Sequence, residues 1–222
     1  LDAGIADGAT GRIGGVANVK VRHPISLARR VLEETPHVLL TGAGAVEFGR
    51  QEEQLRDTTV DQRRRWQRAL DAGTLGLRYF GDPARVDTVG AVALDDSGRL
   101  AAGSSTGGVF GKLPGRVGDA PIFGAGMYAD DTVAVVGTGI GELFLGGLAA
   151  LRVALRVSEG ASPQEACELV ITELADIRVT DVSEPSAGLL ALDGRGRMGA
   201  AYRGASWPVE GPDGPVDAVR IT

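Results

Sequence analysis

The sequence has little of several residue types on which common active sites depend. Its 222 residues include one cysteine, Cys167, and two histidines, His23 and His37. A single cysteine excludes a disulfide framework within the chain and a cysteine metal cluster. Two histidines give little material for a histidine zinc site or a serine–histidine–aspartate triad. Cys167 itself falls in a predicted helix, where we expect it to be a packed core residue rather than a nucleophile.

Long apolar runs and an excess of positive charge are also absent. No apolar run approaches the ~20 residues that span a bilayer, and no signal-peptide pattern is present. We therefore expect a cytoplasmic protein with no membrane partner. The formal net charge of −6 disfavours nucleic acid as a partner. The triplet Arg63, Arg64 and Arg65 does not reverse this, because acidic residues are interleaved and no aromatic platform accompanies it.

Glycine, by contrast, is abundant. The 34 glycines follow no three-residue period, so they indicate many tight turns rather than collagen or a linker. Between the turns, apolar spacing predicts hairpins, single strands and helices. Before residue 88 the expected order is a hairpin over 3–22, helices within 24–36 and 45–49 on either side of a strand over 37–40, a polar helix within 50–73 and a loop over 73–87. From residue 88 the expected order is a hairpin over 88–106, a strand over 131–137, helices from 142 to 157 and from 162, and a hairpin over 186–203.

Strands and helices therefore cluster along the chain instead of alternating. This favours an α+β fold in which sheets stack face to face with helices outside, over a doubly wound parallel sheet. The hairpins over 88–106 and 186–203 are rich in Val, Leu and Ala, and we expect both to be buried on both faces.

Thr88 is the candidate nucleophile. It opens the strand that we predict over 89–94, directly after the polar connector. Threonine favours strands, so a structural role is one interpretation. If the chain were cut between Asp87 and Thr88, however, Thr88 would carry both a hydroxyl and a free α-amine. An α-amine with a pKa of about 7.7–8 can act as the base for its own hydroxyl. The strand that pairs with this one ends at Thr106, which we expect to approach Thr88.

Two further stretches can carry chemistry. Residues 133–142 (VAVVGTGIGE) read as a strand, a glycine turn and a helix. A dinucleotide site is disfavoured, because Glu142 stands where the third glycine of the fingerprint would fall. The turn can instead aim backbone N–H groups, with the Thr138 hydroxyl, at a small anionic centre, or it can be a plain strand-to-helix turn. Arg116 and Asp119 can bind the carboxylate and ammonium of an amino acid, or they can pair with each other.

Five motifs in order resemble the isoaspartyl peptidase/L-asparaginase family, the plant-type asparaginases, which are N-terminal-nucleophile hydrolases related to glycosylasparaginases. The motifs are DTVGAVALD at 87–95, STGG at 105–108, KLPGRVGD at 112–119, GAGMYADD at 124–131 and GTGIGE at 137–142.

The resemblance implies a role for each matching residue. Thr88 matches the nucleophile, released by autocleavage after Asp87, and Thr106 matches the threonine beside it. Arg116 and Asp119 match the pair that binds the substrate's α-carboxylate and α-ammonium. The remaining matches form the oxyanion and substrate-binding turn: Thr138, Gly139 and Gly141.

The implied activity is that of an autoprocessing threonine amidohydrolase. It would cleave the side-chain amide of L-asparagine, or β-aspartyl dipeptides, and release L-aspartate without a metal or organic cofactor. Asp87 stands where many asparaginases have glycine and resembles glycosylasparaginases, so a glycosylasparaginase-like hydrolase is one alternative. A truncated, unprocessed and inactive relative is the other.

The implied fold is a four-layer αββα sandwich of the N-terminal-nucleophile hydrolase type. Family members carry a first strand and helix before the segment that corresponds to LDAGIADG, which here starts at Leu1, so we expect this chain to lack that strand and helix. The chain is expected to be a single domain over 1–222, with an α-subunit portion over 1–87, its connector at about 50–87, and a β subunit over 88–222. A homodimer of αβ units is the expected assembly.

Overall fold

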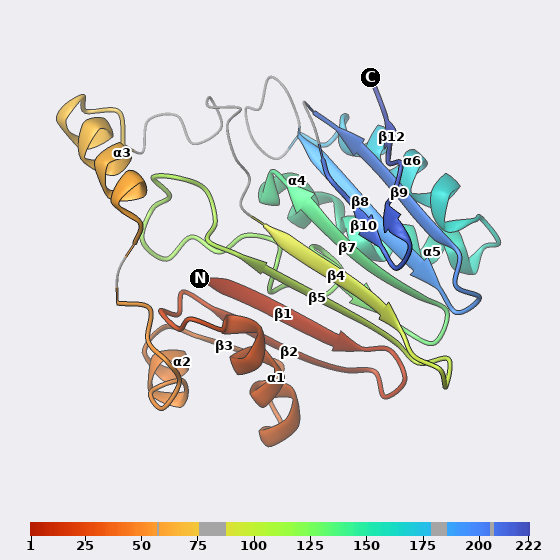
Figure 1. Ribbon diagram of the computed structural model, residues 1–222, viewed down its shortest axis with the longest axis horizontal. Helices are drawn as coiled ribbons and strands as arrows, with labels where there is room; N and C mark the ends of the chain where they lie inside the picture. Colours follow the sequence, from red (N-terminus) through yellow and green to blue (C-terminus); the bar gives the residue numbers. More distant parts are fainter. Residues whose placement is uncertain (57, 76–87, 179–185, 205–206) are drawn as a thin grey trace.

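The computed structural model describes residues 1–56, 58–75, 88–178, 186–204 and 207–222. Figure 1 shows two sheets with helices on their outer sides. Asp87 and most of the loop predicted over 73–87 lie outside the described residues.

The first sheet has five strands in the order β3-β2-β1-β5-β4. All neighbours are antiparallel except β2 and β3, which are parallel. Its strands are β1 (Asp2–Asp7), β2 (Arg12–Ala17), β3 (Leu39–Thr41), β4 (Val89–Leu94) and β5 (Leu100–Thr106). Strands from before and after residue 87 are thus joined in one sheet, at the pairing of β1 with β5.

The second sheet also has five strands, in the order β12-β9-β8-β7-β6. Its strands are β6 (Met127–Ala129), β7 (Val133–Gly139), β8 (Ala187–Asp193), β9 (Met198–Arg203) and β12 (Val219–Arg220). A separate two-stranded ribbon joins β10 (Glu210–Gly211) to β11 (Gly214–Pro215). Because β7 is antiparallel to both β6 and β8, it differs from the parallel strand of a dinucleotide-binding unit.

Helices cover the outer face of each sheet. The described helices are α1 (Pro24–Glu34), α2 (Gly42–Phe48), α3 (Val60–Asp71), α4 (Gly141–Gly147), α5 (Ala149–Ser158) and α6 (Pro163–Leu174). Helix α1 packs on β1 and β2, where Val31 and Val16 share an apolar cluster. Helices α5 and α6 pack on the second sheet and form a second apolar cluster with it. Cys167 of α6 is buried in this cluster, as expected.

The inner faces of the two sheets meet in a third apolar cluster. Members come from both sheets, among them Ala6, Leu100, Val136 and Leu190. At Gly90 the two sheets approach closely, since an added Cβ would lie 2.9 Å from the side chain of Val136. Strands β4 and β7 are therefore held together face to face, which fixes their ends relative to each other.

The helix predicted from 142 to 157 is wrong as one element. It is divided at Leu148, which has a left-handed backbone (φ 47°) and is half exposed. Two glycines, Gly146 and Gly147, precede the break and favour it, because glycine is a poor helix former. The amides that open α5 are then satisfied by the loop at 124–125, since Ala150 and Leu151 donate to its carbonyls.

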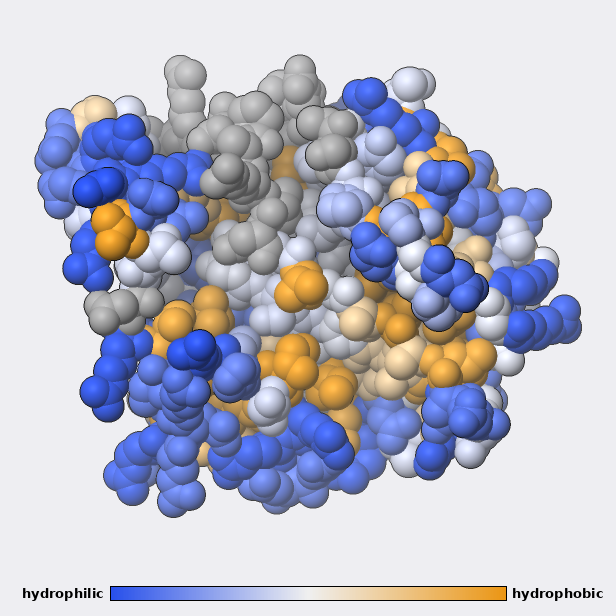
Figure 2. Space-filling model, in the orientation of Figure 1, coloured by the Kyte–Doolittle hydropathy of each residue, from blue (hydrophilic) through white to orange (hydrophobic). Residues whose placement is uncertain are grey.

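The prediction that the hairpin over 88–106 is buried on both faces is also wrong for its first strand. β4 is the last strand of its sheet, and Val89 is 68% exposed. Only alternate residues, Val92 and Leu94, pack toward the core. Figure 2 shows apolar residues in the middle of the face on which β4 lies. By contrast, β8 is central in its sheet and buried along its whole length, as expected.

Within the described ranges, none of the helices is both long enough and apolar enough to cross a bilayer.

Candidate active site

The hydroxyls of Thr88 and Thr106 are in contact. Thr88 directly precedes β4 and Thr106 ends β5, and the antiparallel register, which pairs Val89 with Ser105, brings the two threonines opposite each other. Thr88 Oγ1 donates to Thr106 Oγ1 at 3.0 Å. The Gly108 N–H donates to the same Thr106 oxygen at 2.9 Å. Thr106 is 6% exposed, so this oxygen is a fixed acceptor that orients the Thr88 hydroxyl.

The glycine turn lies at the same end of the molecule as Thr88. β4 begins and β7 ends on the same side in Figure 1, and Thr138 and Gly139 are the last residues of β7. Gly139 has a positive φ of 146°, and a Cβ there would collide with the carbonyl oxygen of Ser186. The turn therefore requires glycine at this position, and its backbone approaches its neighbours closely.

Gly141 brings the two expected substrate-binding residues to the turn. An added Cβ at Gly141 would lie 2.8 Å from Asp119 Oδ1 and 3.0 Å from Arg116 Nη2. The loop that carries Arg116 and Asp119 thus rests on the start of α4. Thr138, Gly139 and Gly141 are brought beside this loop by one strand-to-helix connection.

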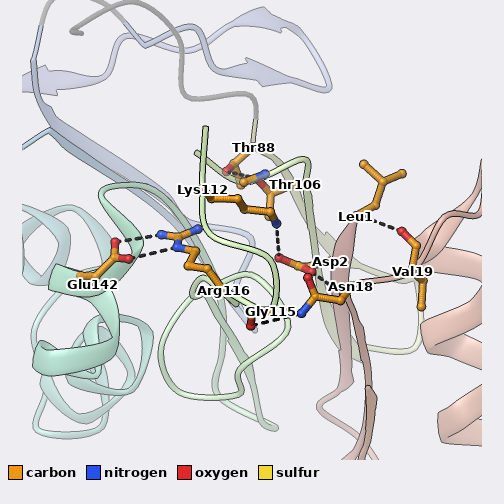
Figure 3. Close-up of polar contacts among 11 residues, drawn as sticks. Leu1, Asp2, Asn18, Val19, Thr88, Thr106, Lys112, Gly115, Arg116 and Glu142 are labelled. Atoms are coloured by element: carbon orange, nitrogen blue, oxygen red, sulfur yellow. Dashed lines mark hydrogen bonds and ion pairs between the residues drawn. The ribbon is translucent and has the colours of Figure 1, made fainter. Parts of the chain in front are cut away.

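Arg116 is held by Glu142, the second residue of α4. Its Nε donates to Glu142 Oε1 at 3.0 Å and its Nη2 donates to Oε2 at 2.8 Å. Figure 3 shows this paired contact. A bidentate pair fixes the plane of the guanidinium as well as its position. The guanidinium of Arg116 is therefore paired with Glu142 and not with Asp119. In the sequence, Glu142 stands out only as the residue that interrupts a dinucleotide fingerprint.

Asp119 is a buried carboxylate with unused bonding capacity. It is 4% exposed, and among the described residues its Oδ2 has no hydrogen-bond partner. Burial raises the pKa of Asp119 to about 7, although the nearby Arg116 guanidinium opposes the shift. An ammonium group brought beside Asp119 would supply the missing donor and the missing charge.

Lys112 and Asp2 form a second charged pair that the sequence did not reveal. Lys112 Nζ lies 3.4 Å from Oδ2 of Asp2, whose side chain is fully buried. Asn18 links Asp2 to the loop that carries Lys112. Its backbone N–H donates to Asp2 Oδ1 at 2.7 Å, and its side chain donates to the Gly115 carbonyl at 3.3 Å. No spacing along the sequence relates Asp2 to Lys112, because packing of the loop that carries Lys112 against β1 sets the contact.

The arrangement combines the Thr88 hydroxyl, the Thr106 oxygen that accepts from it, a glycine turn, and the opposite charges of Arg116 and Asp119. Such a set suits nucleophilic attack on a small substrate that carries both charges. Across the described ranges, no group of three or more His, Cys, Asp or Glu side chains has an arrangement suited to a metal ion.

Sequence comparison places the chain in a known family. The profile of a family described as Asparaginase matches residues 1–207. The isoaspartyl peptidase of Salmonella typhimurium is 41% identical over 91% of this chain and 67% of its own length. The plant-type L-asparaginase of Pyrobaculum calidifontis is 39% identical over 91% of this chain and 69% of its own.

A third relative is the N(4)-(β-N-acetylglucosaminyl)-L-asparaginase of Elizabethkingia miricola, which is 35% identical over 90% of this chain and 60% of its own length. The chain thus spans about two thirds of the length of the curated relatives it matches. These matches confirm the resemblance drawn from the five motifs, and with it the expectation of a hydrolase family. The chain belongs to the asparaginase family.

Proposed function

We propose that this protein is an autoprocessing threonine amidohydrolase that releases L-aspartate from L-asparagine or β-aspartyl dipeptides. The observation that carries the proposal is the 3.0 Å contact between the Thr88 and Thr106 hydroxyls at the start of β4. In a family whose members include isoaspartyl peptidases and asparaginases, this contact supports Thr88 as the nucleophile.

The proposed reaction begins after cleavage between Asp87 and Thr88. The freed α-amine of Thr88 takes the hydroxyl proton, and the oxygen attacks the side-chain carbonyl of the substrate. Thr106 holds the hydroxyl in place. The turn at Thr138 and Gly139 supplies donors to the oxyanion, and one oxyanion-hole donor contributes about 3–4 kcal/mol of transition-state stabilisation where it has been measured in other hydrolases. The protonated α-amine returns the proton to the leaving nitrogen, so that ammonia or an amine leaves, and water then hydrolyses the aspartyl ester.

Arg116 and Asp119 are proposed to hold the substrate's α-carboxylate and α-ammonium, with Gly141 giving them room. Arg116 keeps a defined plane because Glu142 occupies two of its donors, which leaves Nη1 for the substrate. Asp119 is buried and lacks a hydrogen-bond partner at Oδ2 within the described chain, which supports it as the acceptor of an ammonium.

We further propose the four-layer αββα sandwich of N-terminal-nucleophile hydrolases as the fold. The two facing sheets with α1 on one side and α5 and α6 on the other support this. Residues 1–87 and 88–222 would be the α and β portions of a single domain, and two αβ units would form the homodimer.

The 35% identical relative from Elizabethkingia miricola keeps a second substrate in view. Its name specifies an asparagine that carries N-acetylglucosamine on its side-chain nitrogen. The same nucleophile and clamp would serve that substrate, because the aspartyl part is shared and only the leaving group differs.

One experiment tests the cleavage and the activity together. Purified wild-type protein and Thr88→Ala are compared by denaturing gel and intact mass, then assayed with asparagine, a β-aspartyl dipeptide and the glycosylated asparagine. Wild type should split at Asp87–Thr88 and hydrolyse at least one substrate. Thr88→Ala should stay whole and lose activity by about 10³-fold or more. An intact, inactive wild-type chain would mean a relative that is neither processed nor active, and would refute the proposal.

A further inference from the structure

The chain has only two lysines, Lys20 and Lys112, among its 23 basic residues. Lys20 is exposed, whereas the Lys112 side chain is only 20% exposed. Arginine supplies the positive charge at 21 other positions, so lysine at this confined position needs a reason. A compact ammonium on a flexible stem fits where a planar guanidinium would not.

Asp2 holds the ammonium group of Lys112. A fully buried carboxylate is costly unless hydrogen bonds and an opposite charge compensate it. Asp2 receives one hydrogen bond from the Asn18 N–H and the charge of Lys112 at 3.4 Å. Asn18 has a left-handed backbone (φ 58°), and its side chain also bonds the loop at Gly115. Lys112 is therefore tied to β1, outside its own loop.

Lys112 in turn packs on Gly108. A Cβ added at Gly108 would lie 2.6 Å from Lys112 Nζ and 2.9 Å from its Cδ. Gly108 has a positive φ of 83°, and its N–H donates to Thr106 Oγ1, which accepts from Thr88. Figure 3 shows the Lys112 ammonium between Asp2 and the two threonines. A continuous set of contacts thus runs from buried Asp2 to the Thr88 hydroxyl.

We propose that Lys112 is a positioning residue for the nucleophile: anchored by Asp2, it fixes the turn at Gly108 and thereby the Thr106 oxygen that orients Thr88. The inference rests on the proposed function of Thr88 and adds a residue to that site. Without the lysine, the Gly108 N–H loses its fixed direction and the threonine pair loses its alignment. Small misplacements of reacting groups are costly in rate, with about 1 Å worth up to ~100-fold.

The kinetic test compares Lys112→Met with Lys20→Met, the matched control at the chain's other lysine. Lys112→Met should lower kcat by roughly 10- to 100-fold and leave KM within about threefold, while Lys20→Met changes neither. Lys112→Arg should not restore kcat, because the larger head cannot pack on Gly108. A rise in KM at unchanged kcat would overturn the proposal, because Lys112 would then serve the Arg116 loop instead.

Loss of the lysine also leaves Asp2 buried without its counter-charge, so folding needs its own control. The double variant Asp2→Asn/Lys112→Met removes both charges and should recover the thermal stability of wild type without recovering kcat. If the double variant regains wild-type kcat, charge balance is the whole effect and the positioning role is refuted.

A second measurement does not depend on hydrolysis. Wild type and Asp2→Asn are treated with an amine-reactive acetylating reagent, and the two lysine-containing peptides are quantified by mass spectrometry. Lys20 should react quickly in both proteins, whereas Lys112 should react slowly in wild type and several-fold faster in Asp2→Asn. Equal rates at Lys112 in both proteins would refute the anchoring by Asp2. If wild type is inactive on every substrate, the proposed function fails, and the labelling still decides whether Asp2 holds Lys112.

Discussion

Glu142 orients Arg116, whereas the Asp119 carboxylate has no such partner among the described residues. Glu142 takes up two donors of Arg116, so the guanidinium approaches a substrate in one fixed orientation. Asp119 has the opposite character, because it is buried and its charge is opposed only at a distance by Arg116. The site therefore combines a satisfied cation with an unsatisfied anion, and the group that it lacks is an ammonium.

Replacement of Asp119 should reveal how much the burial of this carboxylate lowers the stability of the folded protein. Burial raises the pKa of Asp119 in the folded protein to about 7, well above its ordinary value of 3.8. Between pH 3.8 and about 7 the folded state holds a proton that the unfolded state releases. The contribution of Asp119 to the free energy of unfolding therefore falls as the pH rises from about 4 to about 7, and it stays constant above that. Asp119→Asn stays uncharged and removes this loss.

We expect the stability of Asp119→Asn relative to wild type to increase by on the order of 2–4 kcal/mol between pH 4 and pH 8, since each pKa unit corresponds to about 1.4 kcal/mol. Urea unfolding at the two pH values measures this, and fixed packing effects of the amide cancel in the comparison. A difference in free energy of unfolding that does not change with pH would contradict the prediction.

At the scale of elements, the sequence predicted what local chemistry decides. Turn residues located the hairpins, and the helix predicted from 162 is α6, which begins with a capping box between Ser162 and Glu165. The Thr88–Thr106 contact followed from hairpin register alone. The order of strands in each sheet is not local, so the exposed edge position of β4 was missed. The partners of Arg116 and Lys112 were missed for the same reason, because they are set by packing between distant elements.

The connection between β7 and α4 offers a test at this scale. Gly139→Ala would need both a left-handed backbone and space that the Ser186 carbonyl occupies. Gly196 is the matched control, because its φ is also positive, at 79°, but nothing lies within 4 Å of a Cβ added there. The pair of variants therefore separates backbone strain from crowding.

Gly196→Ala should cost about 1–2 kcal/mol of stability from backbone strain alone. Gly139→Ala should cost roughly 1–3 kcal/mol more, because a crowded methyl group displaces its neighbours, and it should also abolish hydrolysis. Chemical denaturation gives the first quantity and a β-aspartyl hydrolysis assay the second. Equal stability losses for the two variants would show that the turn has room to adjust.

At the scale of the molecule, the two portions of the chain cannot be separated without dismantling a sheet. β1 lies between β2 and β5, and it pairs with β5 over six residues, from Asp2 opposite Thr106 to Asp7 opposite Ala101. The apolar cluster between the sheets also draws on both portions, with Ala6 packed among residues that follow Thr88. One cooperative core therefore includes residues on both sides of the proposed cleavage site.

Residues 1–87 and 88–222 should consequently associate when produced as separate chains. Co-expression with an affinity tag on the first fragment should retain the second through purification in native buffer, and the two should part only in denaturant. The control carries Ala6→Asp, which places a charge in the shared cluster and should abolish co-purification. Recovery of the tagged fragment alone with unmodified sequences would contradict a sheet shared by the two portions through β1 and β5.

The pairing of β1 with β5 also sets an order of events during synthesis. β1 leaves the ribosome almost a hundred residues before its partner β5, so the first sheet can be completed only after the hairpin of β4 and β5 has been synthesised. Thr88 and Thr106 meet only when that hairpin forms. The proposed scission after Asp87 would then follow folding, and a cut chain would mark a molecule that has reached its native structure.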